Sequence, residues 1–150
     1  MSEVRVKIEG LREVQEALKK LPKKATAKNV MRRVLKKRAQ PFADTARDLV
    51  PVDKGALKDS IGVSTVLAKS QRRGFKKEGR DDVVVFVGAG PHPQASLQEF
   101  GTKDFRAQPY MRPAWDKHKN QTLDGIVGDM WDEIEKAAAR AARKAAKAVR

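Results

Sequence analysis

The first part of the chain carries two hydrophobic patterns in succession. Residues 4–8 place valine or isoleucine at every second position, which predicts a half-buried strand that Gly10 ends. Apolar residues then recur at three- and four-residue spacing over residues 11–21. That spacing predicts a short helix that stops at Pro22.

A longer helix is predicted from about Thr26, because one stripe of apolar side chains continues as far as Leu49. Pro41 lies inside this stretch, where a proline removes a backbone donor and clashes with the preceding turn. We therefore expect a kink or a break near residues 37–40. The residue before a proline avoids the helical region, so the helix should end at the Val50–Pro51 step.

Two strands are predicted over residues 60–67 and 83–87. The second is a continuous β-branched and aromatic run, which is typical of a buried strand. The two should pair antiparallel, with the basic segment 68–81 as a hairpin loop. Loops of this length are usually either functional or disordered, and both alternatives stay open.

The second half of the chain predicts mainly helix. Residues 94–100 should form a short helix ended by Gly101, Tyr110 and Met111 a last strand, and Pro113 the first turn of a final helix. The apolar stripe of that helix consists of Leu123, Val127, Met130, Ile134 and Ala138. Residues 137–150 are almost entirely alanine, lysine and arginine, which predicts a protruding basic helical tail.

These elements predict one α+β domain over residues 1–150. We expect a small, mostly antiparallel sheet with helices packed on one face, and a long C-terminal helix. Hydrophobic residues make up 40% and aromatic residues 5% of the chain, which favours a modest core completed by neighbouring subunits. There is no cysteine, so disulfides and thiolate metal sites are excluded.

The N-terminus lacks the apolar run of a signal peptide, and no stretch approaches transmembrane length. We therefore expect a protein made in the cytoplasm and without a membrane partner.

Positive charge is concentrated early in the chain. The formal net charge is +14, and between Glu16 and Asp44 there are ten lysines and arginines but no acidic residue. Such a field attracts polyanions such as DNA. The alternatives are a solvated helix face, or a helix that docks on an acidic partner.

Candidate catalytic groups are few. His92 lies between two prolines and His118 among lysines, so neither matches a hydrolytic triad or a zinc-ligand spacing. The glycines of Gly88-Ala89-Gly90 are followed by Pro91 instead of a helix, which does not fit a dinucleotide-binding turn. We expect no enzyme activity, no cofactor and no metal.

Two segments rich in proline and glycine remain. The first is Pro51-Val52-Asp53-Lys54-Gly55-Ala56-Leu57-Lys58-Asp59-Ser60-Ile61. The second is Glu99-Phe100-Gly101-Thr102 followed by Ala107-Gln108-Pro109-Tyr110-Met111-Arg112-Pro113-Ala114. In the first, Asp53 is predicted to cap a short helical turn through Leu57 and Ile61, although a turn needed only for folding is an alternative. In the second, Glu99 is predicted to pair with an arginine, with Arg112 as the candidate, within or between subunits. An exposed, unpaired carboxylate is the alternative.

Both segments resemble a family of phage head–tail joining proteins, the gene-product-ten-like tail-completion component of long-tailed lambdoid phages. In that family a helix ends in a Pro-x-Asp-Thr-Gly-x-Leu-x-x-Ser-Ile corner, and a Glu-Phe-Gly-Thr turn precedes a Gln-Pro-Phe-Leu-Arg-Pro-Ala segment. This chain departs at Lys54, where threonine is usual, and it has Tyr110-Met111 for Phe-Leu. The second departure conserves apolar volume.

The resemblance implies a structural virion protein of the neck, which joins the portal or connector to the tail and is needed for tail completion or attachment. It implies a homo-oligomeric ring around the DNA channel, with sixfold symmetry as the first expectation and twelvefold as the second. Adjacent partners would be head-closure or connector proteins, tail-terminator or tail-tube proteins, and the passing DNA. A basic architectural nucleic-acid-binding protein is the alternative.

The candidate site residues follow from the two segments and the loop. Those expected at a subunit or partner interface are Pro51, Asp53, Gly55, Leu57, Glu99, Phe100, Gly101, Thr102, Gln108, Pro109, Tyr110, Arg112 and Pro113. Those expected to contact DNA or an adjacent ring are Lys69, Arg72, Arg73, Lys76, Lys77 and Arg80.

Overall fold

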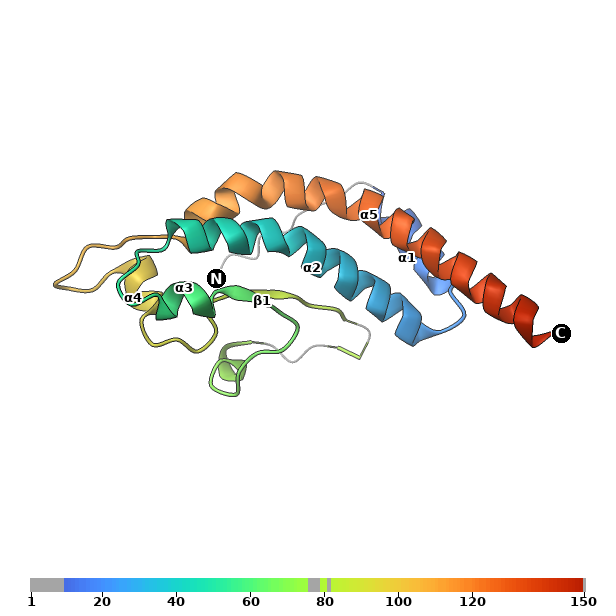
Figure 1. Cartoon of the computed structure of the whole chain (residues 1–150), viewed down its shortest axis with the longest axis horizontal. Helices are drawn as coiled ribbons and strands as arrows, with labels where there is room; N and C mark the ends of the chain where they lie inside the picture. Colours follow the sequence, from blue (N-terminus) through green and yellow to red (C-terminus); the bar gives the residue numbers. More distant parts are fainter. Residues whose placement is uncertain (1–9, 76–78, 81, 150) are drawn as a thin grey trace.

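Two long helices run side by side through most of the molecule (Figure 1). The computed structural model describes residues 10–75, 79–80 and 82–149. Within it, helix α2 spans Lys24–Leu49 and helix α5 spans Met111–Ala148. Helix α1, Leu11–Lys19, packs against both of them and confirms the short helix predicted before Pro22. The strand predicted over residues 4–8 lies outside the described residues, as do Lys76 and Lys77.

A small antiparallel sheet packs against α2. Strand β1, Gly62–Ser64, pairs with strand β2, Phe86–Gly88, so that Val63 lies opposite Val87. Both strands contact α2, whose other side packs on α5. The helices therefore lie on one face of the sheet, and the predicted α+β class is confirmed.

Both strands are shorter than predicted, and β2 is half-buried instead of buried. A turn directly after β1 explains why the strands are short. The Ser64 hydroxyl donates to the Val66 carbonyl (2.8 Å) and accepts from the Val66 N–H (3.1 Å), a turn that takes the chain away from the ladder. Residues 82–85 then have no opposite strand to pair with.

Three short helical segments complete the described chain. Helix α3, Ala56–Ser60, follows the first corner; the 3-10 turn η1, Arg72–Gly74, lies in the loop between the strands; and helix α4, Ala95–Phe100, ends at Gly101 as predicted. The last strand predicted at Tyr110 and Met111 is wrong, because Met111 begins α5.

Of the kink or break predicted near residues 37–40, the break is wrong, because helix α2 continues through Pro41. Figure 1 shows one continuous ribbon that bends along its length. Ala43 and Ala46, in the turns after the proline, are completely buried, and this packing holds the helix across the missing hydrogen bond. The helix ends at Val50, which is extended (ψ 132°) before Pro51, as predicted.

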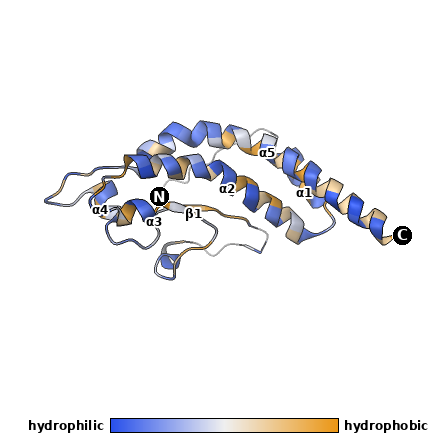
Figure 2. Ribbon diagram, in the orientation of Figure 1, coloured by the Kyte–Doolittle hydropathy of each residue, from blue (hydrophilic) through white to orange (hydrophobic). Residues whose placement is uncertain are grey.

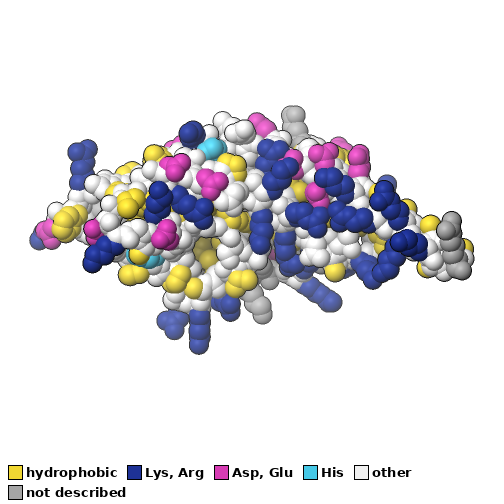
Figure 3. Space-filling view, in the orientation of Figure 1, with side chains coloured by type: hydrophobic (Ala, Val, Ile, Leu, Met, Phe, Trp, Pro, Cys, Tyr) yellow, Lys and Arg dark blue, Asp and Glu magenta, His cyan; other side chains and the backbone are white. Residues whose placement is uncertain are grey.

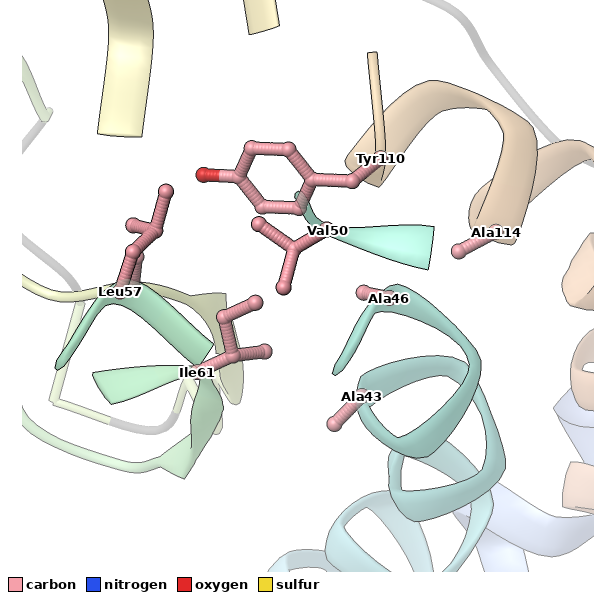
Figure 4. Close-up of a cluster of buried hydrophobic side chains, with 8 residues drawn as sticks. Ala43, Ala46, Val50, Leu57, Ile61, Tyr110 and Ala114 are labelled. Carbon is pink, nitrogen blue, oxygen red and sulfur yellow. The ribbon is translucent and has the colours of Figure 1, made fainter. Parts of the chain in front are cut away.

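Buried apolar side chains form two clusters. The first joins the end of α2 to the corners and contains Ala43, Ala46, Val50, Leu57, Ile61, Ala89, Tyr110 and Ala114 (Figure 4). The second joins α1, α2 and α5 and contains Val14, Val30, Val34, Ile126, Met130, Ile134 and Ala137. The stripe of α5 therefore includes Ala137, whereas the predicted member Ala138 is exposed.

The last turns of α5 extend beyond the start of α2 (Figure 1). Figure 2 shows this end as an alternation of pale apolar and strongly hydrophilic residues, which are the alanines and the lysines and arginines. Over residues 138–149 every residue except the half-buried Ala141 is exposed. This end of the helix therefore leaves its alanine face unburied.

Candidate functional site

The buried carboxylate of Glu99 connects the end of α4 to the start of α5. Glu99 is 5% exposed and accepts hydrogen bonds from the backbone N–H groups of Tyr110 (2.8 Å), Met111 (2.9 Å) and Arg112 (3.1 Å). The first N–H groups of a helix have no partner within it. The next residue, Pro113, has no N–H at all. The carboxylate of Glu99, twelve residues before the first residue of the helix, therefore satisfies every unpartnered donor at the start of α5.

The side chain of Arg112, in the first turn of α5, also binds Glu99. Its Nε donates to Glu99 Oε1 (2.9 Å), and its second guanidinium nitrogen donates to the Glu99 carbonyl (2.8 Å). The guanidinium also lies 5.0 Å from the centre of the Phe100 ring, a cation–π contact. The predicted pairing of Glu99 with Arg112 is thus confirmed, and it forms within one chain.

The hydrogen bonds decide the charge of Glu99. Burial alone would raise the pKa of this carboxyl, but the N–H groups of Met111 and Tyr110 and the Arg112 side chain outweigh it, so its pKa is lowered. Helix α5 also directs its positive dipole end at the carboxylate. Glu99 is therefore held as an anion, with its oxygens occupied by structural hydrogen bonds.

Gly101 and Thr102 turn the chain back toward α5. Gly101 has φ 74° and ψ −177°, a region essentially restricted to glycine, and a Cβ there would lie 2.6 Å from the Ala107 nitrogen. The Thr102 hydroxyl accepts hydrogen bonds from the Asp104 (3.3 Å) and Phe105 (3.1 Å) N–H groups. This tight loop brings the chain back to α4 and sets the distance that the Glu99 cap requires.

Tyr110 joins the two proline- and glycine-rich segments. Its ring is 1% exposed and lies over Val50, between Leu57 and Ala114 (Figure 4). Its hydroxyl donates to the Ala95 carbonyl (3.2 Å). Burial, with the nearby Glu99 charge, raises the pKa of Tyr110, so it stays neutral. The two segments therefore fold as one corner, which we call the Glu99 corner and define as residues 50–61 and 95–114.

In the first segment the predicted cap is wrong. Helix α3 begins after Gly55, which has φ 79°, and no side chain of the described chain caps it. Asp53 is exposed and makes no hydrogen bond to the described residues, so Gly55 alone sets the turn. Lys54 is also exposed.

The corner has a hollow and an apolar rim. A depression of about 290 Å³ is bordered by Pro51, Asp53 and Gly55 on one side and by His92 and Gln98 on the other. Exposed large apolar side chains lie in the same region: Val52, Leu97, Phe100 and Phe105. His92, Gln98 and Phe105 are not predicted at this surface from the sequence. For Phe105 a signal was present, because it is an aromatic residue among the charged residues Lys103, Asp104 and Arg106.

The basic hairpin loop, residues 68–81, lies outside the residues of this corner. Lys69, Arg72, Arg73 and Arg80 are all exposed. The Lys28 ammonium of α2 donates to the Arg80 carbonyl, and the Gln71 amide donates to the Gly90 carbonyl (2.7 Å). These two contacts tie the loop to the rest of the chain.

A second buried carboxylate lies between α2 and α5. Asp129, 8% exposed, accepts from Arg38 Nε (2.7 Å) and lies 3.4 Å from the Lys37 ammonium, and Glu133 pairs with Arg33. The Arg38 hydrogen bond lowers the pKa of Asp129. Gly125 leaves the space for Arg38, since a Cβ there would lie 2.0 Å from its guanidinium. For these three cations of α2, the acidic partner is α5 of the same chain.

The remaining cations dominate the surface in Figure 3, especially over the start of α2 and the end of α5. Among the described residues, no group of three or more histidine, aspartate and glutamate side chains is placed to hold a metal ion. None of the described helices is both long and apolar enough to cross a membrane.

The sequence profile of one known family, described as "Bacteriophage HK97-gp10, putative tail-component", matches residues 12–101. The match begins in α1 and includes both the Pro51 segment and Glu99-Phe100-Gly101. No curated protein and no solved structure matches the chain. Because more than half of its residues fit this profile, the chain belongs to the HK97-gp10-like family of bacteriophage tail components.

Proposed function

We propose that this structural tail protein works in the virion neck, where it joins the head to the tail as a ring around the DNA channel. The observation that carries the proposal is the Glu99 corner. Its buried carboxylate is occupied in holding α4 to α5 and pairs with Arg112, while apolar side chains around it face outward. A rigid corner with an exposed apolar rim suits protein–protein contact better than chemistry.

Phe100 and Phe105 are the strongest candidates for that contact. They are 68% and 75% exposed, although aromatic side chains gain most by burial. A closed ring requires head-to-tail contacts, in which two different surfaces of one subunit meet. We place the Glu99 corner on one of these surfaces, with a sixfold ring as the first expectation and a twelvefold ring as the second.

The exposed basic loop supports a second contact. Lys69, Arg72, Arg73 and Arg80 are exposed and lie outside the residues of the corner, so they offer a second, basic surface. We propose that the loop faces the passing DNA or an adjacent ring of head-closure, connector, tail-terminator or tail-tube protein.

The test is electron microscopy of assembled virions, combined with complementation of a phage that lacks this gene. The proposal predicts rotationally symmetric density for this protein at the head–tail junction. It also predicts that Phe105→Ser leaves a folded protein that fails to support joining, whereas Val149→Ser, at an equally exposed apolar residue far from the corner, supports it.

Absence of the protein from finished virions would refute the proposal. A salt titration of DNA affinity distinguishes the alternative. Tight binding by the isolated chain with a steep salt dependence would instead favour a basic architectural nucleic-acid-binding protein.

A further inference from the structure

We propose that an open groove at the other end of the molecule binds an acidic, amphipathic segment of a partner protein. The groove lies between the first turns of α2 and the last turns of α5 and has a volume of about 640 Å³. Its floor is apolar and is formed by Pro22, Val30, Ala137, Ala141, Ala145 and Ala148. We call it the alanine groove.

The alanines make the groove accessible to a large side chain. They recur every three or four residues and so form a continuous strip along α5. Beyond Ala137 the residues of this strip are exposed, except for the half-buried Ala141. A segment with larger apolar side chains would bury this strip and fill the volume, which falls within the range of about 300–1,000 Å³ usual for binding pockets.

Cations surround the floor. Lys23, Arg33, Arg140 and Lys144 border the groove, and none of its described lining residues is acidic. Arg33 already pairs with Glu133 of α5, whereas Arg140 and Lys144 are exposed on the outer turns. A bound segment therefore gains from carboxylates on either side of its apolar residues.

The same features disfavour two other occupants. A second copy of the chain would bring a net charge of +14 to a rim that is already positive. DNA would satisfy the cations but would leave the floor unfilled, because the described lining contains no aromatic side chain on which a base could stack. An acidic protein segment matches both the floor and the rim.

The geometry favours a helical segment. The two walls are themselves helices, and an amphipathic helix that lies in such a groove uses apolar anchors spaced three or four residues apart. The family match ends at Gly101, so the α5 wall lies beyond the matched residues. The groove is thus a second surface, at the opposite end of the molecule from the Glu99 corner (Figure 1).

The experiment titrates the full chain with a labelled helical peptide that has leucines at i, i+4 and i+7 and glutamates on both flanks. A peptide with lysines in place of the glutamates and a short duplex DNA are the comparison ligands. The double variant Arg140→Glu, Lys144→Glu tests the rim. Its control, Arg143→Glu, Lys147→Glu, makes the same charge change on the same helix outside the groove.

We expect the acidic peptide to bind, the lysine peptide not to bind, and the rim variant to lose about tenfold in affinity while the control loses about twofold. A second pair of variants tests the floor of the alanine groove without changing the charge. Ala141→Gln, in the floor, should weaken binding, whereas its control Ala142→Gln, outside the groove, should not. Circular dichroism checks that each variant keeps its helix content.

Three results would overturn the inference: no binding of the acidic peptide, equal losses in the rim and control variants, or groove-dependent binding of DNA alone. This inference rests on the proposed function for its biological role, but different experiments refute the two proposals. Loss of peptide binding leaves a ring in the virion unaffected, and absence of the protein from virions leaves the peptide result unaffected.

Discussion

The Glu99 corner and the α2–α5 pair each bury one carboxylate, but they satisfy it differently. Glu99 accepts three backbone N–H groups from the start of α5 and one side-chain bond from Arg112. Asp129 accepts only side-chain contacts, from Arg38 and Lys37. A backbone donor is fixed by the helix, whereas a long side chain can turn to solvent. The corner should therefore tolerate loss of its acid much less well than the helix pair does.

The largest effect is expected for Glu99→Ala. This change leaves three backbone donors without their acceptor and removes one of the two acceptors of the exposed Arg112 side chain, which should lower the free energy of unfolding by about 3 kcal/mol. Urea unfolding followed by circular dichroism measures it. The exposed Glu135→Ala on α5 is the control and should change stability by less than about 0.5 kcal/mol. Equal effects of the two changes would contradict the comparison.

Gly101→Ala should be the next most damaging. An alanine would need a positive φ at Gly101 and would place its Cβ against the Ala107 nitrogen, so we expect a loss of about 2 kcal/mol. At Gly128, in the middle of α5, an added Cβ would have no neighbouring side chain within 4 Å. There the same change should raise the free energy of unfolding by roughly 0.5–1 kcal/mol. Thermal or urea unfolding measures both variants. A lower free energy of unfolding for Gly101→Ala and a higher one for Gly128→Ala would support the account, and a stabilising Gly101→Ala would refute it.

Asp129→Asn tests the carboxylate between α2 and α5. It removes the charge that pairs with Arg38 and Lys37 but leaves an amide oxygen that still accepts, so we expect a loss of about 1 kcal/mol. Asp132→Asn, at an exposed position of the same helix, is the matched control. Salt should reduce the Asp129 effect more than the Glu99 effect, because mobile ions screen side-chain charges near the surface. If Asp129→Asn lowered the free energy of unfolding as much as Glu99→Ala does, the proposed difference between the two carboxylates would be contradicted.

The smallest expected effect is a pH dependence. The pKa of Glu99 is lowered in the folded protein, so the anion stabilises the fold above the unfolded-state value of about 4.3. This contribution is lost as the pH falls through the lower, folded-state pKa. Wild type and Glu99→Gln should therefore differ most near pH 7, and the difference should shrink as the pH falls below the unfolded-state value of about 4.3. Unfolding measured in urea between pH 7 and pH 3 tests this, and a constant difference would count against it.

Much of the fold follows from local sequence. The short helix before Pro22, the end of α2 at Val50 and the helix stop at Gly101 are all predicted correctly, because proline and glycine restrict the backbone independently of context. The Glu99–Arg112 pair is predicted from two charged residues beside rigid neighbours.

The failures depend on distant contacts. Local propensity predicts a strand at Tyr110 and Met111, but the Glu99 carboxylate makes that position the start of a helix. Pro41 predicts a kink or a break, and the break does not occur because Ala43 and Ala46 pack the helix on both sides of the next turn. The pairing of Arg38 with Asp129 depends on the register of two helices that are far apart in sequence, which hydrophobic spacing does not determine.

The most direct test of the central claim is amide hydrogen exchange at Tyr110, Met111 and Arg112, in wild type and in Glu99→Gln, under conditions where both are folded. If Glu99 holds the start of α5, these three amides are protected in wild type. They lose that protection in the variant, while amides in the buried middle of α2 keep theirs. Fast exchange in wild type, or unchanged protection in the variant, would contradict the account.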